Sequence, residues 1–326
     1  MIIAERSAAG PDAAVIFARS RIADIVKRHL DSGGQREQTP VAGLTIHGKT
    51  GPAEPTSFLY DPSFALIACG SKRVVLGDES YVYDESHFLL TSVGLPTIVQ
   101  VLDASPSQPY YSIKLNIDLE LARELICEVA QYGPESSAGT GMAIGPLAPP
   151  LALAAMRLVE LLDSPQDIPI LARTLQREIL YHVLTSPIGD RLRQAVQLGT
   201  RTNRVAAAIQ WIRENFTEAL RIDELAQRAG MGESTLHHHF RAITAMSPLQ
   251  YQKQLRLHEA RRLMVNDRID AGLAALKVGY ESPTQFNREY RRMFGAPPKR
   301  DVASVHRCRA SPEEGPCDAA AGWCLP

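Results

Sequence analysis

The chain of 326 residues is long enough for two domains, and its 45% hydrophobic and 22% charged residues are typical of a globular protein. No apolar run approaches the ~20 residues of a membrane-spanning helix, and the first residues carry no secretion signal, so we expect no membrane partner and a cytoplasmic protein. The net charge of −1 conceals an asymmetry: residues 191–301 hold 19 Lys and Arg against 11 Asp and Glu, a net +8, whereas residues 1–190 carry a net −8, so one domain is expected to meet a polyanion.

The N-terminal part predicts one helix followed by a β domain. Residues 13–30 place apolar side chains at helical spacing. From Val41 to Asp118, short apolar runs alternate with Gly, Pro and Ser turns, which predicts strands of a small barrel or sandwich. The clearest strands are 64–69, 73–76, 81–83, 88–90, 97–102 and 110–117.

Helices are predicted for the remainder. Three of them, at 119–132, 150–162 and 169–184, follow the strands. The turn-forming residues 186–190 and the polar run to Asn203 predict a connection. We therefore divide the chain into an N-terminal domain (1–190), a linker (191–203), a helical domain (204–301) and a tail expected to be disordered (302–326).

Residues 221–244 predict a helix-turn-helix motif. Leu225 and Ala226 form the apolar face of one helix, and Gly230 stands where the chain must turn with a positive φ. Leu236, Phe240 and Ile243 follow at the spacing of a second, narrowly amphipathic helix.

The same pattern recurs at residues 274–293. Gly279 corresponds to Gly230, and Phe286 and Tyr290 correspond to Leu236 and Phe240. Ser282 is an expected N-cap, with Gln285 placed to reach back to it.

A connecting helix is predicted between the motifs. Ser247 is its N-cap, Pro248 suits the first position and Gln250 the third. At ~1.5 Å per residue this helix is ~27 Å long, which suits holding two recognition helices about one DNA turn apart, ~34 Å.

The two motifs and this helix resemble the DNA-binding domain of the AraC family over residues 204–300. The resemblance is carried by Ser247-Pro248-Leu249-Gln250-Tyr251, Val278-Gly279-Tyr280-Glu281-Ser282 and Phe294-Gly295-Ala296-Pro297-Pro298. The N-terminal part resembles one type of AraC N-terminal domain through Tyr60-Asp61-Pro62-Ser63, Gly70-Ser71-Lys72-Arg73-Val74, Tyr83-Asp84 and Ser105-Pro106-Ser107-Gln108-Pro109-Tyr110.

The resemblance implies a fold and partners. The fold class is α+β, with an N-terminal cupin-like β domain with flanking helices and a C-terminal all-α domain with two helix-turn-helix motifs. The implied function is sequence-specific transcription regulation, with double-stranded DNA as partner, a small-molecule effector in the N-terminal domain, and RNA polymerase if the protein activates. One departure from the family is Gly232, which stands where a Ser or similar cap is usual and loses a side-chain hydrogen bond worth a few tenths of a kcal/mol.

Eight outward positions on the recognition helices are the expected DNA contacts. Arg288 can bind guanine O6 and N7, and Asn287 can pair with adenine. Arg241 and Arg291 lie nearer the helix ends and suit phosphate contacts. The full set is Ser234, His237, His238, Arg241, Thr284, Asn287, Arg288 and Arg291.

No metal site, cofactor or catalytic site is expected. Consecutive helical residues point ~100° apart, so His237, His238 and His239 cannot converge on one ion. His47 and His87 stand alone among the strands. The five cysteines have no metal-ligand spacing; Cys69 and Cys127 are expected as small core residues.

The interior of the β domain is the expected ligand site. Its candidate ligand contacts are the aromatic or polar-tipped strand residues Tyr60, Phe64, Tyr81, Tyr83 and His87. The helices at 150–184 carry enough apolar side chains to cover the barrel and leave a stripe for a second subunit, so a homodimer is a hypothesis.

Two alternatives remain open. One is an enzyme fused to a DNA-binding domain, although no nucleophile–base spacing or phosphate loop supports it. The other is a DNA-binding protein whose N-terminal domain only dimerises. The effector, the operator and the sign of regulation do not follow from the sequence.

Overall fold

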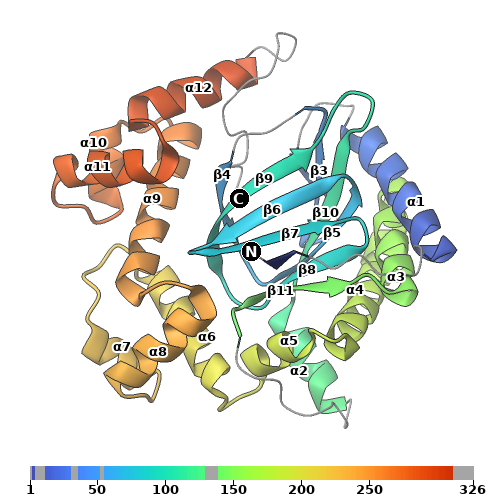
Figure 1. Cartoon of the computed structure of the whole chain (residues 1–326), viewed down its shortest axis with the longest axis horizontal. Coiled ribbons are helices and arrows are strands. Elements are labelled where there is room, and N and C mark those ends of the chain that lie inside the picture. The colour runs from blue at the N-terminus through green and yellow to red at the C-terminus, as the bar shows by residue number, and fades with distance from the viewer. Residues whose placement is uncertain (1, 4–11, 31–35, 52–54, 129–138, 311–326) are drawn as a thin grey trace.

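The computed structural model describes residues 2–3, 12–30, 36–51, 55–128 and 139–310. As predicted, the N-terminal part is rich in β-strands and the described C-terminal part is helical. The two parts lie side by side (Figure 1). None of the helices within these ranges is long and apolar enough to span a membrane.

Two sheets face each other in the N-terminal part. The first has the order β1-β7-β6-β9-β4, formed by Ile2–Ile3, Glu79–Asp84, Ser71–Leu76, Leu95–Asp103 and Thr56–Tyr60. The second has the order β11-β8-β5-β10-β3-β2, formed by Met142–Pro146, His87–Thr91, Ser63–Cys69, Tyr110–Asn116, Leu44–Lys49 and Arg36–Gln38. The pairs are antiparallel apart from β1 with β7.

Strand alternation in the second sheet separates two cores. Along β5, Phe64 and Leu66 face one side, whereas Ala65 and Ile67 face the other. Ala65 and Ile67 meet side chains of the first sheet, such as Val74, in the interior of the barrel. Both faces of this sheet are therefore buried, which explains its nearly continuous apolar runs.

Helices cover the outer face of the second sheet. α1 (Ala13–Leu30), α2 (Leu119–Glu128), α3 (Pro149–Glu160) and α4 (Ile168–Thr185) form this layer, and α3 and α4 are joined by the short turns Leu161–Asp163 and Pro165–Asp167 (Figure 1). Ile22 and Ile25 of α1 and Leu158 of α3 are fully buried in it. The apolar spacing of residues 13–30 therefore marks a real core face.

The C-terminal part consists of α6 (Arg201–Glu214), α7 (Ile222–Arg228), α8 (Glu233–Thr244), α9 (Pro248–Asn266), α10 (Ala271–Lys277), α11 (Pro283–Phe294) and α12 (Pro298–Ala310). The segment expected as a linker contains a further helix, α5 (Asp190–Val196). Leu192 and Val196 are buried in the core of the N-terminal helical layer, because their apolar side chains sit four residues apart on one helical face.

The C-terminal tail corrects one expectation. Residues 302–310, expected to be disordered, continue α12, whose Asp301 and Val305 are buried. The rest of the expected tail, residues 311–326, lies outside the described residues, as do Cys317 and Cys324.

The cysteines differ from expectation in part. Cys69 is half-buried, but Cys127 is exposed at the end of α2 and is not a core residue. The apolar neighbours of Cys127 in the sequence face the core from other positions of the helical turn. Among the described residues, no group of three or more His, Cys, Asp or Glu side chains is arranged to hold a metal ion.

Candidate nucleic-acid interface and ligand site

The first helix-turn-helix motif is formed by α7 and α8, as predicted. Gly230, between them, has φ +61°, a left-handed conformation that costs glycine nothing. Leu225, Leu236 and Phe240 are fully buried between the two helices. Gly232 is the N-cap of α8 and makes no side-chain cap hydrogen bond.

The second motif is formed by α10 and α11. Gly279 in its turn has φ +87°, and Phe286 and Tyr290 form the buried stripe of α11. The Ser282 hydroxyl accepts a hydrogen bond from the Gln285 amide N–H at 3.3 Å. The Gln285 side chain does not reach back to Ser282 as expected, because its amide donates to Glu289 at 3.2 Å.

The connecting helix α9 begins with the predicted capping box. Gln250 N–H donates to Ser247 Oγ at 3.3 Å, and Ser247 N–H donates to Gln250 Oε1 at 3.0 Å. Its 19 residues give a length of about 28 Å.

Arg256 of α9 ties the two motifs together. Its guanidinium donates to the carbonyls of Phe216 at 2.7 Å and Glu218 at 2.8 Å, just before the first motif. It also donates to the Gly279 carbonyl at 2.8 Å, in the turn of the second motif. Five N–H donors in a planar fork allow one arginine to hold backbone from both halves.

A buried ion pair supports the second motif. Arg261 of α9 donates to both carboxylate oxygens of Asp301 in α12, at 2.7 and 3.0 Å, and only 2% of its surface is exposed. The Tyr290 hydroxyl of α11 donates to the same carboxylate at 2.7 Å. Three helices therefore meet at one charge pair, which the sequence did not suggest because its members are 40 residues apart.

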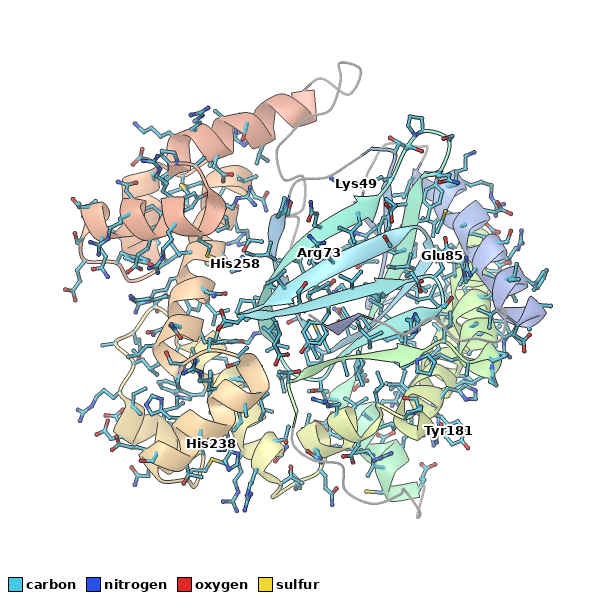
Figure 2. All side chains as sticks on the ribbon, in the orientation of Figure 1. Lys49, Arg73, Glu85, Tyr181, His238 and His258 are labelled. Atoms are coloured by element: carbon cyan, nitrogen blue, oxygen red, sulfur yellow. The ribbon has the colours of Figure 1, made fainter. Side chains whose placement is uncertain are left out.

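All eight side chains expected to contact DNA are exposed. Those on α8 lie opposite Leu236 and Phe240, and those on α11 lie opposite Phe286 and Tyr290. His238 projects from the outer side of the helical part (Figure 2). His239 is half-buried, and burial lowers the pKa of its imidazole.

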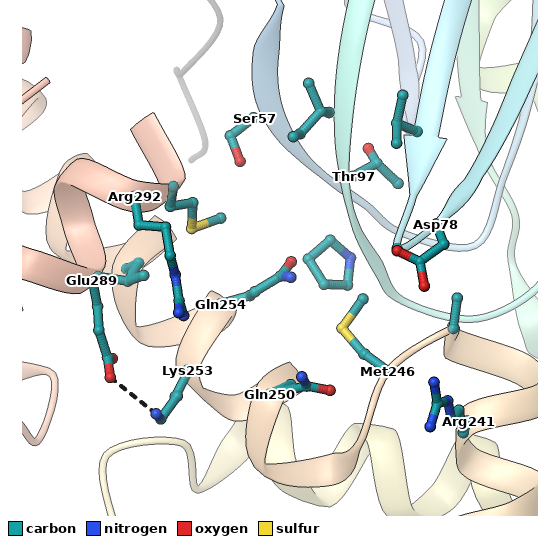
Figure 3. A pocket seen from close by; sticks show the side chains of 17 residues that line it. Ser57, Asp78, Thr97, Arg241, Met246, Gln250, Lys253, Gln254, Glu289 and Arg292 are labelled. Atoms are coloured by element: carbon teal, nitrogen blue, oxygen red, sulfur yellow. Dashed lines mark hydrogen bonds and ion pairs between the residues drawn. The ribbon is translucent and has the colours of Figure 1, made fainter. Parts of the chain in front are cut away.

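A groove of 370 Å³ lies between the barrel and parts of α8, α9 and α11 (Figure 3). Arg241, Lys253 and Arg292 line its helical side. Asp78, in the turn between β6 and β7, lines the barrel side. Arg241 therefore belongs both to the expected DNA-reading face and to the wall shared with the barrel.

Hydrogen bonds also join the two parts. Tyr251 Oη of α9 donates to the Gly94 carbonyl at 2.9 Å, and Gly141 N–H donates to the Ile243 carbonyl at 2.8 Å. Arg213 of α6 forms an ion pair with Asp61.

His258 of α9 also takes part in this contact. Its Nε2 lies 3.2 Å from Ser57 Oγ of β4 (Figure 2 labels His258 at the edge of the barrel). Burial, together with the nearby charge of Arg261, lowers the pKa of His258 to about 3. The imidazole is therefore neutral in the folded protein near pH 7.

The five candidate ligand contacts are all buried but do not share one site. Tyr60 and Tyr83 face the barrel interior near each other. Tyr81 faces the same interior, with its hydroxyl against Glu79 and Thr140. His87 Nδ1 lies 2.9 Å from Asp84 Oδ1. Phe64 faces the helical layer instead and packs against Phe88 with ring centroids 5.5 Å apart.

Lysines in the barrel were missed by the sequence analysis. Lys49 of β3, Lys72 of β6 and Lys114 of β10 lie at strand positions in phase with interior residues. Lys72 Nζ donates to Tyr60 Oη at 3.1 Å. The sequence did contain a sign of them: Lys72 is two and four residues from the apolar Val74 and Leu76, so all three face the same side of the strand. A lysine on an inward face is unusual.

Two family models match the chain. Residues 40–191 match the AraC-type transcriptional regulator N-terminus, and residues 225–302 match a helix-turn-helix domain.

Relatives of established name resemble part of the chain. The HTH-type transcriptional activator RhaS of Pectobacterium carotovorum is 28% identical over 137 residues, 42% of this chain and 47% of the relative. The HTH-type transcriptional regulator ExsA of Pseudomonas aeruginosa is 26% identical over 143 residues, 44% of this chain and 51% of the relative. The chain thus spans about half the length of these curated relatives.

A solved structure resembles nearly the whole chain. It is ToxT from Vibrio cholerae O395 bound to (E)-4-(8-methylnaphthalen-1-yl)but-3-enoic acid, with a TM-score of 0.54, 9% identity, and coverage of 83% of this chain and 99% of ToxT. At this identity the likeness shows the fold alone.

Proposed function

Since the chain belongs to the AraC family of transcriptional regulators, we propose that it is a sequence-specific DNA-binding regulator of transcription. The observation that carries the proposal is the pair of exposed recognition helices, α8 and α11, joined by the rigid helix α9. On this proposal α8 and α11 enter successive major grooves on one face of the duplex.

The two recognition helices offer different chemistry to DNA. On α11, Arg288 suits guanine and Asn287 suits adenine, while Arg291 suits a phosphate. On α8, His237 and His238 can donate to base acceptors or phosphates, and Arg241 suits a phosphate. Ser234 and Thr284, at the helix starts, complete the proposed contacts. Sequence reading is thus assigned mainly to the second motif.

We further propose that the N-terminal domain binds a small molecule that changes DNA binding or activation. The likeness of fold to ToxT, which has been solved with a small organic molecule bound, supports this. So does the direct contact between the barrel and α8, because a ligand can change DNA affinity only through a structure that both sites share.

The proposed domain division keeps the sensor at residues 1–190 and the DNA reader at 204–301, with 191–203 between them. A homodimer through the helical layer and a contact with RNA polymerase for an activator complete the proposal. As a DNA-binding protein the chain would act in the cytoplasm, and it would have no enzymatic activity.

Selection of chromosomal fragments by the purified full-length protein tests DNA binding. We expect enrichment of a few sites and a shift assay in which affinity falls steeply with salt, since each phosphate contact releases a counterion. Enrichment of no sequence above input, with a folded protein, would refute the proposal.

Cells producing either the full chain or residues 195–301 test the sensor. If both regulate the target promoter identically in every growth condition, the N-terminal domain senses nothing.

A further inference from the structure

A cluster of lysines and tyrosines occupies the interior of the barrel near one end. Lys49, at the end of β3, is paired in register with Tyr110, at the start of β10. Lys72 of β6 is paired with Tyr83 of β7. Figure 2 places Lys49 at the upper end of the barrel, away from α2 and α5.

The two lysines are close enough to act on each other. Partial burial, and then the positive charge of Lys72, lower the pKa of Lys49. Both side chains are half-buried, so they can be reached from solvent. Within the described part of the chain, no carboxylate forms an ion pair with Lys49 or with Lys72. Two neighbouring ammonium groups without an acid between them favour an anion.

Hydroxyl groups stand beside these charges. Tyr60 accepts a hydrogen bond from Lys72 at 3.1 Å and lies beside the Tyr83 hydroxyl. The Tyr110 hydroxyl is fully buried and makes no hydrogen bond of normal geometry with the described residues, its polar neighbours being Ser112, Tyr60 and Lys72. The O–H of Tyr110 can therefore donate a hydrogen bond to an acceptor atom of a ligand.

Aromatic rings surround the same charges. Lys72 Nζ lies 5.7 Å from the centre of the Tyr60 ring, and Lys114 Nζ lies 5.9 Å from the Phe58 ring. Phe58 and Tyr60 pack edge to face with centroids 4.7 Å apart. The surroundings of the lysines therefore suit an apolar body better than a fully hydrated ion.

We propose that this barrel site binds a small organic acid, with its carboxylate held by Lys49, Lys72 and the Tyr110 hydroxyl and its apolar body against Phe58, Tyr60 and Tyr83. The inference rests on the proposed function, since it names the chemical class of the effector. Binding would neutralise two repelling charges in a core that reaches α8, because Tyr60 and Phe240 belong to one continuous apolar cluster.

The test uses the purified full-length protein without DNA. The probes are benzoate and octanoate, their neutral analogues benzamide and octanamide, and inorganic phosphate. Thermal denaturation and titration calorimetry give the rise in Tm and the Kd for each probe. We expect at least one acid to bind and its amide not to bind.

Substitutions then locate the site. Lys49→Met and Lys72→Met should each weaken the bound acid about tenfold to a hundredfold, as expected for a lost charge-assisted hydrogen bond. Lys27→Met, on the exposed side of α1, is the matched control and should change nothing. In the ligand-free protein Lys49→Met should raise Tm, since it removes a like-charge repulsion. Lys72→Met also loses the hydrogen bond to Tyr60, so a single cooperative unfolding transition is the check that it folds.

Four results would overturn the inference. They are equal binding of acid and amide, unchanged acid binding in both interior variants, binding of phosphate alone, or no binding of either acid up to about 10 mM, where even millimolar affinities register. None of these results bears on DNA binding, which is tested separately by the selection of chromosomal fragments. If the effector proved to be a neutral molecule, the N-terminal domain would still be a sensor, but the proposal of an organic acid would be wrong.

Discussion

The two helix-turn-helix motifs of this chain have similar sequences but different surroundings. Leu236, Phe240 and Ile243 of the first motif belong to the same apolar core as Tyr60 and Val74 of the barrel. The second motif has a core of its own, built from α9, α10 and α11, with Phe286 and Tyr290 at its centre. The first motif is therefore packed as part of the barrel, and the second is attached through α9.

This difference suggests that the two motifs respond differently to a change in the barrel. A change inside the barrel can reach α8 through shared packing. In contrast, α11 packs in a separate core and meets the barrel at β4 and across the groove that contains Arg241 and Arg292. The side chains best suited to read bases, Arg288 and Asn287, stand on the motif that is more remote from the barrel core. Sequence reading and ligand response would thus be carried by different motifs.

Asp301→Asn should have the largest effect on stability. It leaves Arg261 buried without its counter-charge, which costs about 3–5 kcal/mol. Hydrogen exchange measured at increasing urea concentrations should show the second motif opening first, while the backbone amides of α8 remain protected from exchange. Arg262→Ala is the control, because its pair with Glu259 is partly exposed and is worth about 0.5 kcal/mol. Simultaneous opening of both motifs would contradict the separation of their cores.

Gly77→Ala should disturb the first motif through the barrel. Gly77 has φ +57°, and an added Cβ would lie 2.8 Å from Cβ and O of Ala245, at the end of α8. We expect a loss of about 2 kcal/mol or more in the free energy of unfolding, and altered DNA affinity. Gly199→Ala is the control, because Gly199 also has a positive φ, +84°, but an added Cβ would meet nothing within 4 Å. It should cost about 1 kcal/mol and leave DNA affinity unchanged. Equal effects of the two substitutions would mean that only backbone strain matters.

Arg288→Ala and Arg291→Ala separate base reading from phosphate binding within α11. Arg288→Ala should lower discrimination between specific and random DNA by about 1–3 kcal/mol. Arg291→Ala should weaken all sequences alike and reduce the salt slope by about one unit. Competition shift assays at several salt concentrations measure both. A uniform loss on all sequences for Arg288→Ala would place that side chain on a phosphate.

Acid should destabilise the contact at His258. Its folded pKa of about 3 lies below the unfolded value of about 6.5, so the unfolded chain binds more protons between these limits. The free energy of unfolding should therefore fall as pH drops below about 6.5, by up to about 1.4 kcal/mol per pH unit. His258→Gln keeps a partner for Ser57 without the titration. Urea unfolding between about pH 7.5 and 5 should be flatter for this variant than for the wild type; identical slopes would exclude His258 as the cause.

Gly232→Ser should have the smallest effect. Gly232 already has N-cap geometry, with φ −74° and ψ 153°, but offers no side-chain acceptor to α8. Serine should stabilise the first motif by a few tenths of a kcal/mol. Thermal unfolding measures the gain, and Ser282→Gly in the second motif is the converse substitution, expected to lose a similar amount.

The local chemistry of the helical half was readable from the sequence. Glycines at 230 and 279, the capping box of Ser247 and Gln250, and the stripe of Leu236 and Phe240 depend on neighbours within a few residues. Such short-range requirements leave a pattern in the residues themselves. The exposure of the eight proposed DNA contacts follows from the same helical period.

Only the tertiary structure decided which distant groups meet. Asp301 with Arg261 and His258 with Ser57 are contacts that no periodicity links. Lys49 and Lys72 come from different sheets, yet the charge of Lys72 lowers the pKa of Lys49. Phe64 was expected in the interior with Tyr60, but the side that a strand residue faces depends on register, and its strand is buried on both faces. The sequence by itself determined the two motifs and the class of both domains, because helix caps, turns and strand alternation are local. The shared core of barrel and first motif, and the charges inside the barrel, arise from pairing across the chain, which only the folded structure specifies.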